Sequence, residues 1–162
     1  MNIRFVLRDI REARILKGIL EENGFNTEIY ENIEDIYSDI EKTEIIFIDI
    51  LRIDENKIIG GNKINQDIEA KKEEIKSNEE KKRIKEIWIV FIVPFWMRFN
   101  SEKARELARK IGFRSARYIK RPFTAQEIVE YCKKILQQKR NNSDNRNIKK
   151  KNQSIEKLSF EE

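Results

Sequence analysis

Asp49 is the residue of this sequence best placed to do chemistry. It interrupts an apolar run at residues 44–51, which reads E-I-I-F-I-D-I-L. An unbroken run of branched and aromatic residues is typical of a strand covered on both faces, as in a parallel sheet flanked by helices. A carboxylate at the end of such a strand is costly to desolvate without partners, and open α/β sheets bind ligands at that end. The groups that neutralise Asp49 therefore decide what this site does.

The composition excludes several kinds of site. The chain has no histidine and a single cysteine, Cys132. Disulfides, Cys/His zinc sites and catalytic triads with an imidazole base are therefore excluded, and we expect Cys132 to be a small core residue. The N-terminus has no signal-peptide pattern, and the most apolar stretch, residues 87–97, is too short for a membrane span and contains Pro94. We expect a soluble cytoplasmic protein without a membrane partner.

The hydrophobic pattern predicts five strands, each followed by a helix. Asp9, Asn32 and Thr124 are suited to cap the first, second and last helices, and Asn23-Gly24 to end the first. Right-handed crossovers then make a doubly wound α/β fold, a five-stranded parallel sheet with helices on both faces. The predicted strands cover residues 2–7, 26–30, 44–51, 87–93 and 117–120.

Two charged segments extend this pattern. Residues 62–86 read as an insertion or an extended third helix, and fourteen of the twenty residues 67–86 are charged, seven of each sign. From residue 138 the chain is rich in Asn, Lys, Arg and Ser, and residues 139–151 hold six cations against Asp144. We expect a domain at residues 1–137 and a basic, disordered tail at residues 138–162. The rest of the chain is close to neutral, unlike a basic nucleic-acid module.

Five alternating units, an Asp ending the third strand, and Y-I-K-R-P-F at residues 118–123 together resemble the receiver domain of bacterial two-component response regulators. The resemblance covers residues 2–137. It implies a flavodoxin-like sheet of strand order 2-1-3-4-5, and a phosphoryl group passed from a histidine kinase to Asp49. Tyr118 matches the switch aromatic of the family, and Arg121-Pro122 the position of its cis peptide bond.

The resemblance fails at several pocket positions. The family has two consecutive acids after the first strand, where this chain has Leu7 and Arg8, with Asp9 one step later. Val93 replaces the hydroxyl residue that ends the fourth strand in the family, and Val cannot donate a hydrogen bond.

The positive charge of the pocket also differs. Arg121, with Lys120 beside it, replaces the Lys before Pro, and the two cations are not equivalent because Arg has a planar fork. With only Asp49 and Asp9 as metal ligands, we expect no cofactor, and Mg²⁺ only if the pocket still functions.

Two interpretations of Asp49 stay open. It is a phosphoacceptor, or it is a permanently paired carboxylate that closes the crevice of the sheet. We favour the second, with Arg8 standing in for the metal, because two such charges about 4 Å apart attract by about 4 kcal/mol at an effective dielectric of 20, before desolvation is subtracted. Helix capping accounts fully for Asp9.

The loop after the fourth strand carries four large apolar residues, Phe95, Trp96, Met97 and Phe99. In the family this loop lies beside the pocket and the output face, so these residues could form a patch that binds a partner. Side chains of this kind more often fold back over the core, and we slightly favour that interpretation.

These observations favour a stand-alone, receiver-like module, a pseudo-receiver. It would act in a two-component phosphorelay through contacts with a histidine kinase or another signalling protein, with weak or lost phosphorylation and no enzymatic activity beyond autophosphotransfer to Asp49. One alternative is a working response regulator that uses Asp49. The other is a nucleic-acid-associated protein that binds through residues 139–151, although a solvated tail is the commoner meaning of such a run.

Overall fold

The computed structural model describes residues 2–53 and 86–159, with side chains as far as residue 154. The chain divides into two compact units, Met1–Ala125 and Gln126–Glu162. The expected charged insertion lies outside the described residues, apart from Glu86. The elements are β1 (Asn2–Val6), α1 (Ile10–Glu22), β2 (Asn26–Tyr30), η1 (Ile33–Tyr37), η2 (Ile40–Lys42), β3 (Ile45–Asp49), η3 (Ile50–Arg52), β4 (Trp88–Val93), α5 (Ser101–Lys110), β5 (Ser115–Lys120) and α6 (Ala125–Ser159).

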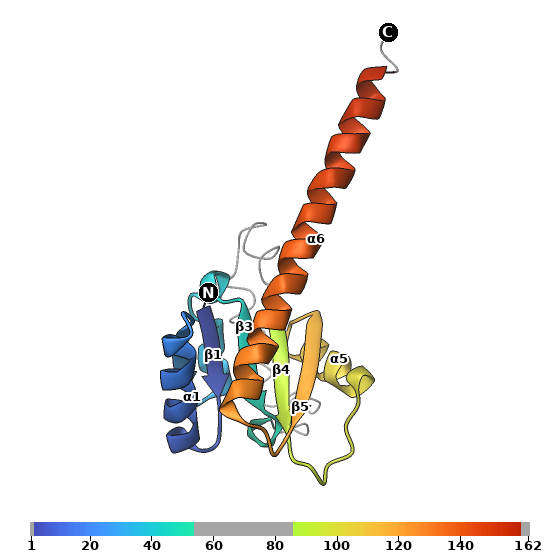
Figure 1. The fold of residues 1–162 in the computed structure, drawn as a ribbon. Helices are drawn as coiled ribbons and strands as arrows, with labels where there is room; N and C mark the ends of the chain where they lie inside the picture. Colours follow the sequence, from blue (N-terminus) through green and yellow to red (C-terminus); the bar gives the residue numbers. More distant parts are fainter. Residues whose placement is uncertain (1, 54–85, 160–162) are drawn as a thin grey trace. The chain divides into compact units, whose positions relative to one another are not determined.

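The sheet has the predicted topology. Its five strands run parallel in the order β2-β1-β3-β4-β5, as Figure 1 shows. Both ends of α1 match the sequence, because Asp9 accepts a hydrogen bond from the Arg11 amide at 2.9 Å, and Gly24 takes a positive φ after the last turn. The prediction of a doubly wound, flavodoxin-like fold is confirmed.

The two faces of the sheet bury alternate residues of each strand. Val6, Ile48 and Phe91 pack in one cluster with η1 and α5. Residues of the other parity include Phe5 and Phe47, whose rings stack at 4.9 Å. Right-handed crossovers place α1 on this second face, because β1 to β2 steps along the sheet in the opposite direction from β4 to β5. Helices therefore cover both faces, as the sequence predicts.

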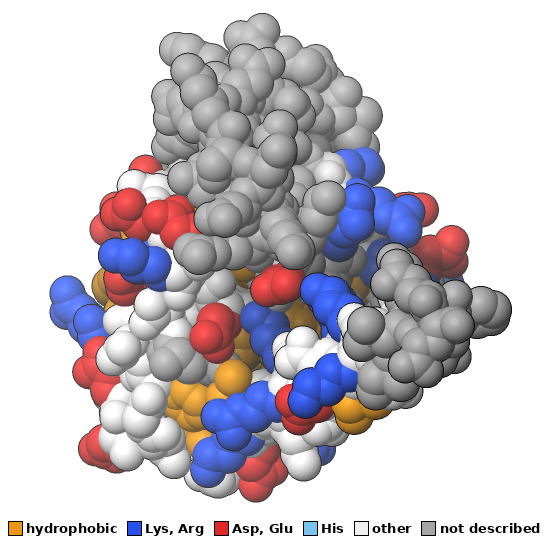
Figure 2. Space-filling model, turned by 90° about the horizontal axis from the view of Figure 1, so that it is seen from above, with side chains coloured by type: hydrophobic (Ala, Val, Ile, Leu, Met, Phe, Trp, Pro, Cys, Tyr) orange, Lys and Arg blue, Asp and Glu red, His pale blue; other side chains and the backbone are white. Residues whose placement is uncertain are grey.

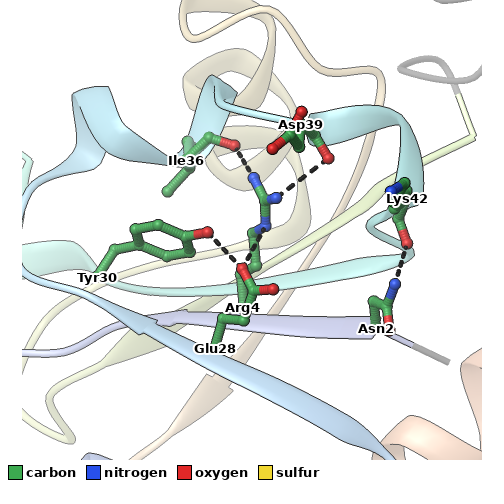
Figure 3. A network of polar contacts seen from close by, with 7 residues as sticks. All are labelled: Asn2, Arg4, Glu28, Tyr30, Ile36, Asp39 and Lys42. Carbon is green, nitrogen blue, oxygen red and sulfur yellow. Dashed lines mark hydrogen bonds and ion pairs between the residues drawn. The ribbon is translucent and has the colours of Figure 1, made fainter.

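The second helix differs from the prediction. The segment after β2 forms two short 3-10 helices, η1 and η2, instead of an α-helix. In Figure 3 the buried Arg4 guanidinium donates to the carbonyls of Ile36 and Asp39. We attribute the difference to these bonds, because an α-helix would use the same carbonyls for its own amides. Asp39, with φ of 49°, interrupts the turn between the two pieces.

Three further groups complete the surroundings of Arg4. Its Nε lies 3.6 Å from a carboxylate oxygen of Glu28, which also accepts a hydrogen bond from the Tyr30 hydroxyl (Figure 3). The Arg4 guanidinium lies over the Tyr30 ring, 5.1 Å from its centroid. Burial, followed by the hydrogen bond to Glu28, raises the pKa of Tyr30 to about 12. A strand side chain thus holds the segment that replaces the second helix.

The C-terminal segment also differs from its prediction. Residues 138–159, expected to be disordered, continue α6 as one helix (Figure 1). No Gly or Pro interrupts residues 125–159, and the Lys, Gln, Glu and Arg found there are good helix formers. The boundary expected between residues 137 and 138 stays a prediction. No helix within the described ranges has the length and apolar character needed to cross a bilayer.

Candidate functional site

An open hollow of about 710 Å³ lies where the strands end, within the first compact unit. This is the edge at which open α/β sheets bind ligands. The turn after β1, the first turn of α1, the end of β3 and the loop after β4 all contribute to it. Its lining residues are Arg8, Asp9, Ile10, Arg11, Glu12, Asp49, Leu51, Pro94, Phe95, Trp96 and Arg121.

Asp49 is buried at this edge, with 3% of its surface exposed. One carboxylate oxygen accepts a hydrogen bond from the Leu51 amide at 3.0 Å and so caps η3. The other lies 3.5 Å from a guanidinium nitrogen of Arg121. Both oxygens therefore have partners from the chain itself.

Arg121 is held mainly by a second acid. Its two terminal nitrogens donate to the two carboxylate oxygens of Glu12, at 2.6 and 2.7 Å, in a bidentate pair. The hydrogen bond to Glu12 is the largest cause of a raised Arg121 pKa, and Asp49 adds to it. The Arg121 amide also donates to the Val93 carbonyl at 2.8 Å. Arg121 thus bridges Glu12 on α1 and Asp49 on β3, and we call these three residues the Arg121 bridge.

The predicted pairing of Arg8 with Asp49 is wrong. Arg8 is exposed and lines the hollow, and no ion pair joins it to Asp49 within the described part of the chain. Arg121 takes this place because its backbone bond to the end of β4 holds it next to β3. Asp9 is also exposed, and its side chain caps α1 as expected.

Sequence reasoning missed Glu12 as a site residue. Glu12 lies in the first turn of α1, three residues after the Asp9 cap. The available signal was its position, because an acid in the first turn of a helix that follows a strand lies at the carboxyl edge of the sheet. Its approach to Arg121, 109 residues further along the chain, depends on the tertiary fold.

The other predicted pocket residues are dispersed. Val93 is fully buried and contributes its carbonyl to Arg121, whereas Lys120 is exposed and does not line the hollow. The Arg121-Pro122 peptide bond is cis, as the resemblance implies. The role of Asp49 as a phosphoacceptor stays a prediction.

Tyr118 and the loop after β4 form a partly buried aromatic group. Tyr118 meets the edge of Phe99 at 5.3 Å, and Phe99 meets Phe91 at 6.1 Å. Met97 also packs against the core cluster. In contrast, Phe95 and Trp96 are 73% and 64% exposed. The predicted patch is therefore divided: two of its residues cover the core and two line the hollow. The switch role of Tyr118 stays a prediction.

The residues present do not fit Mg²⁺. In receiver domains the ion would need about three oxygen ligands from acids at this edge. Among the described residues, no group of three or more Asp, Glu, Cys or His side chains could hold a metal. Asp9 caps its helix, and the guanidinium of Arg121 lies between the other two carboxylates. Arg121 therefore already places a positive charge between Glu12 and Asp49.

Comparison with known proteins identifies the fold. No family model and no curated protein matches the sequence. The signal receiver domain of a putative Luxo repressor protein from Vibrio parahaemolyticus matches 88% of this chain and 94% of its own, with a TM-score of 0.56 and 13% identity. The N-terminal domain of a response regulator/sensory box/GGDEF 3-domain protein from Carboxydothermus hydrogenoformans matches 88% of this chain and 99% of its own, with a TM-score of 0.56 and 18% identity. This chain has the receiver fold.

Longer proteins also contain this fold. NtrX from Brucella abortus matches 90% of this chain with a TM-score of 0.55 and 21% identity, but this chain spans only 30% of the NtrX chain. These identities are low, so the likeness describes the fold.

Proposed function

We propose that this chain is a signalling module of two-component type that acts through protein contacts, with phosphorylation of Asp49 weak or lost. The observation that carries the proposal is the Arg121 bridge. In a phosphoryl transfer, an oxygen of Asp49 would attack phosphorus while the bond from phosphorus to the donor's leaving group breaks. Two anions must meet in that step, so a free cation site beside the carboxylate is needed.

The Arg121 bridge works against this step in two ways. The guanidinium is already committed to Glu12 through two short hydrogen bonds, so its charge is not free to follow an incoming phosphoryl group. The positions of the usual acids hold Leu7 and Arg8, and Val93 offers no hydroxyl. Arg121 neutralises Asp49 without a metal ion, so the carboxylate is stabilised but is a poor acceptor for a phosphoryl group.

The rim of the hollow suits contact with another protein. Ile10, Leu51, Phe95 and Trp96 are exposed apolar residues that line it together. Aromatic side chains at the centre of such a surface contribute strongly to protein binding. We propose a histidine kinase or another cytoplasmic signalling protein as the partner, with no enzymatic activity of the module itself.

Intact-mass measurement tests the proposal. The full chain is incubated with acetyl phosphate and Mg²⁺, beside the Asp49→Asn variant and a receiver domain with an unaltered pocket. We expect the reference receiver to gain one phosphoryl mass and this chain to gain none under the same conditions. A gain that disappears in Asp49→Asn would overturn the proposal.

That outcome would establish the second candidate, a working response regulator. One observation favours it: Asp49 ends the middle strand and lines an open hollow, so a small donor could reach it. The same measurement therefore decides between the two.

A further inference from the structure

The C-terminal half of α6 is an exposed, strongly basic helix. Side chains 140–154 are exposed, and Lys139 is half-buried. Residues 139–154 include one acid, Asp144, and one apolar residue, Ile148. The hydroxyls of Ser143 and Ser154 donate to carbonyls of their own helix, at 3.0 Å each. The cations of this segment are Lys139, Arg140, Arg146, Lys149, Lys150 and Lys151.

Helical geometry gathers four of the six cations. Each residue turns the helix by about 100° and advances it by about 1.5 Å. Lys139, Arg146 and Lys150, at spacings of seven and four, therefore fall within about 40° of one another along about 16 Å, and Lys149 lies about 60° beyond Arg146 on one side of them. We call these four residues the cationic face. Arg140 and Lys151 lie on the opposite side from Lys149, about 80–100° beyond Lys150, so they are a matched pair of cations outside the face.

The cationic face is unsuited to a second copy of the helix. It continues the line of the buried residues Ile128, Cys132 and Ile135, which follow the alternating spacing of a coiled coil. A coiled coil needs apolar residues at the continuing positions. Those positions hold Lys139, Asn142, Arg146, Lys149 and Gln153. Two copies would bring like charges together, so the face is suited to an anionic surface and not to a second copy of itself.

A membrane surface also fits poorly. A helix that lies on a bilayer needs a broad apolar face to insert beside its cations. Among the described side chains of residues 139–154, Ile148 alone is apolar, and it is 56% exposed. Phosphates of nucleic acid require no such insertion. They accept hydrogen bonds from Lys, Arg, Asn and Gln, and the major groove admits an α-helix.

We propose that the cationic face of α6 binds the phosphate backbone of nucleic acid. The contact is electrostatic and independent of sequence, because the face offers charges and amides without a built site for a base edge. The binding does not depend on Asp49 or on the proposed signalling role.

Fluorescence anisotropy with the full chain and a labelled DNA duplex of about 20 base pairs tests this proposal. Four phosphate contacts predict that the logarithm of the binding constant falls with the logarithm of salt concentration with a slope of about −3 to −4. The test variant is Arg146→Gln/Lys150→Gln. Its control, Arg140→Gln/Lys151→Gln, removes the same charges from the same segment outside the face. Circular dichroism checks that both keep the helix.

We expect the test variant to lose about tenfold or more in affinity near 0.1 M salt and to reduce the slope by about 2. The control should change affinity less than about threefold, as expected for cations beyond direct phosphate contact. Equal losses in both variants would overturn the proposal, and so would no binding at low salt. Equally tight binding to polyglutamate or to anionic vesicles would overturn nucleic acid as the partner.

Discussion

At the scale of single residues, the Arg121 bridge sets the charge that surrounds Asp49. Arg121 and Glu12 are each 30% exposed, and Asp49 is almost completely buried. A half-buried bidentate pair is stronger than a surface pair, since water screens it less. The same three side chains also join α1, β3 and the end of β5, so the pocket charge and the stability of this edge are linked.

A double-mutant cycle measures this link. We expect Arg121→Met to lower the free energy of unfolding by about 1–3 kcal/mol, because Asp49 loses its cation. Combined with Glu12→Gln, the two losses should be non-additive by about 1 kcal/mol or more. Urea denaturation provides both numbers.

The exposed pair Lys17 and Glu21, 3.7 Å apart on α1, is the control. Its coupling in the cycle Lys17→Met and Glu21→Gln should stay below about 0.5 kcal/mol. A bridge coupling no larger than this would contradict the proposed role of Arg121.

Tyr30 gives a prediction at alkaline pH. Its pKa is raised from 10.0 to about 12 in the folded chain, so the unfolded chain releases the phenol proton first. The contribution of Tyr30 to stability is complete below pH 10 and is lost as the pH rises towards 12. We expect the free energy of unfolding to fall more steeply over this window in the wild type than in Tyr30→Phe. Equal slopes of the unfolding free energy against pH in the wild type and in Tyr30→Phe would contradict this prediction.

At the scale of elements, Arg4 determines the form of the segment after β2. The Arg4 guanidinium donates hydrogen bonds to the carbonyls of Ile36 and Asp39. The Tyr37 hydroxyl donates to the Ile111 carbonyl at 2.6 Å. Strand β1 and the end of α5 thus fix η1 from two sides. Side-chain hydrogen bonds from Arg4 and Tyr37 thus add to the backbone hydrogen bonds of the two 3-10 helices.

We expect Arg4→Lys to lower the free energy of unfolding by about 1–3 kcal/mol. Lys keeps the positive charge but lacks the planar guanidinium that donates to both carbonyls. Amide hydrogen exchange should quicken in residues 33–42 and stay unchanged in α5. Arg11→Lys, at an exposed position of α1, is the control. Unchanged exchange in residues 33–42 would show that Arg4 does not hold the segment.

The sequence predicts elements better than contacts. Periodic apolar residues identified the five strands, α1 and α5, because these elements depend on local pattern and burial. The residue type and position of Asp9 identified it as the cap of α1. The 3-10 pieces were missed because Arg4 lies about 32 residues from the carbonyl it binds. Likewise Arg8 was favoured because it occupies the position of an acid in the family, whereas the fold brings Arg121 to Asp49. Side-chain partners across elements require the register of the whole sheet.

At the scale of the whole molecule, charges of both signs are mixed. Figure 2 shows Lys and Arg side chains interspersed with Asp and Glu side chains on the described surface of this view. The basic segment of α6 is the departure from this balance, with six cations against one acid in residues 139–151. The polar composition of that segment suggested disorder, but its lack of Gly and Pro also permits the helix.

Cys132 provides a probe of global unfolding. Burial raises the pKa of this thiol to about 12, and it is the single cysteine of the chain. The thiolate is the reactive form, so the folded protein should resist alkylation near neutral pH. We expect the modification rate to rise with urea in parallel with the loss of circular dichroism. Rapid modification of the native protein would contradict the burial of Cys132.

The Arg121 bridge has one more consequence. A magnesium ion must be recruited from solution, but a guanidinium that belongs to the polypeptide is always present at the effective concentration its tether imposes. Chelators cannot strip it and metal starvation cannot deplete it. The positive charge beside Asp49 is therefore part of every folded copy of the chain and does not vary with the metal content of the solution.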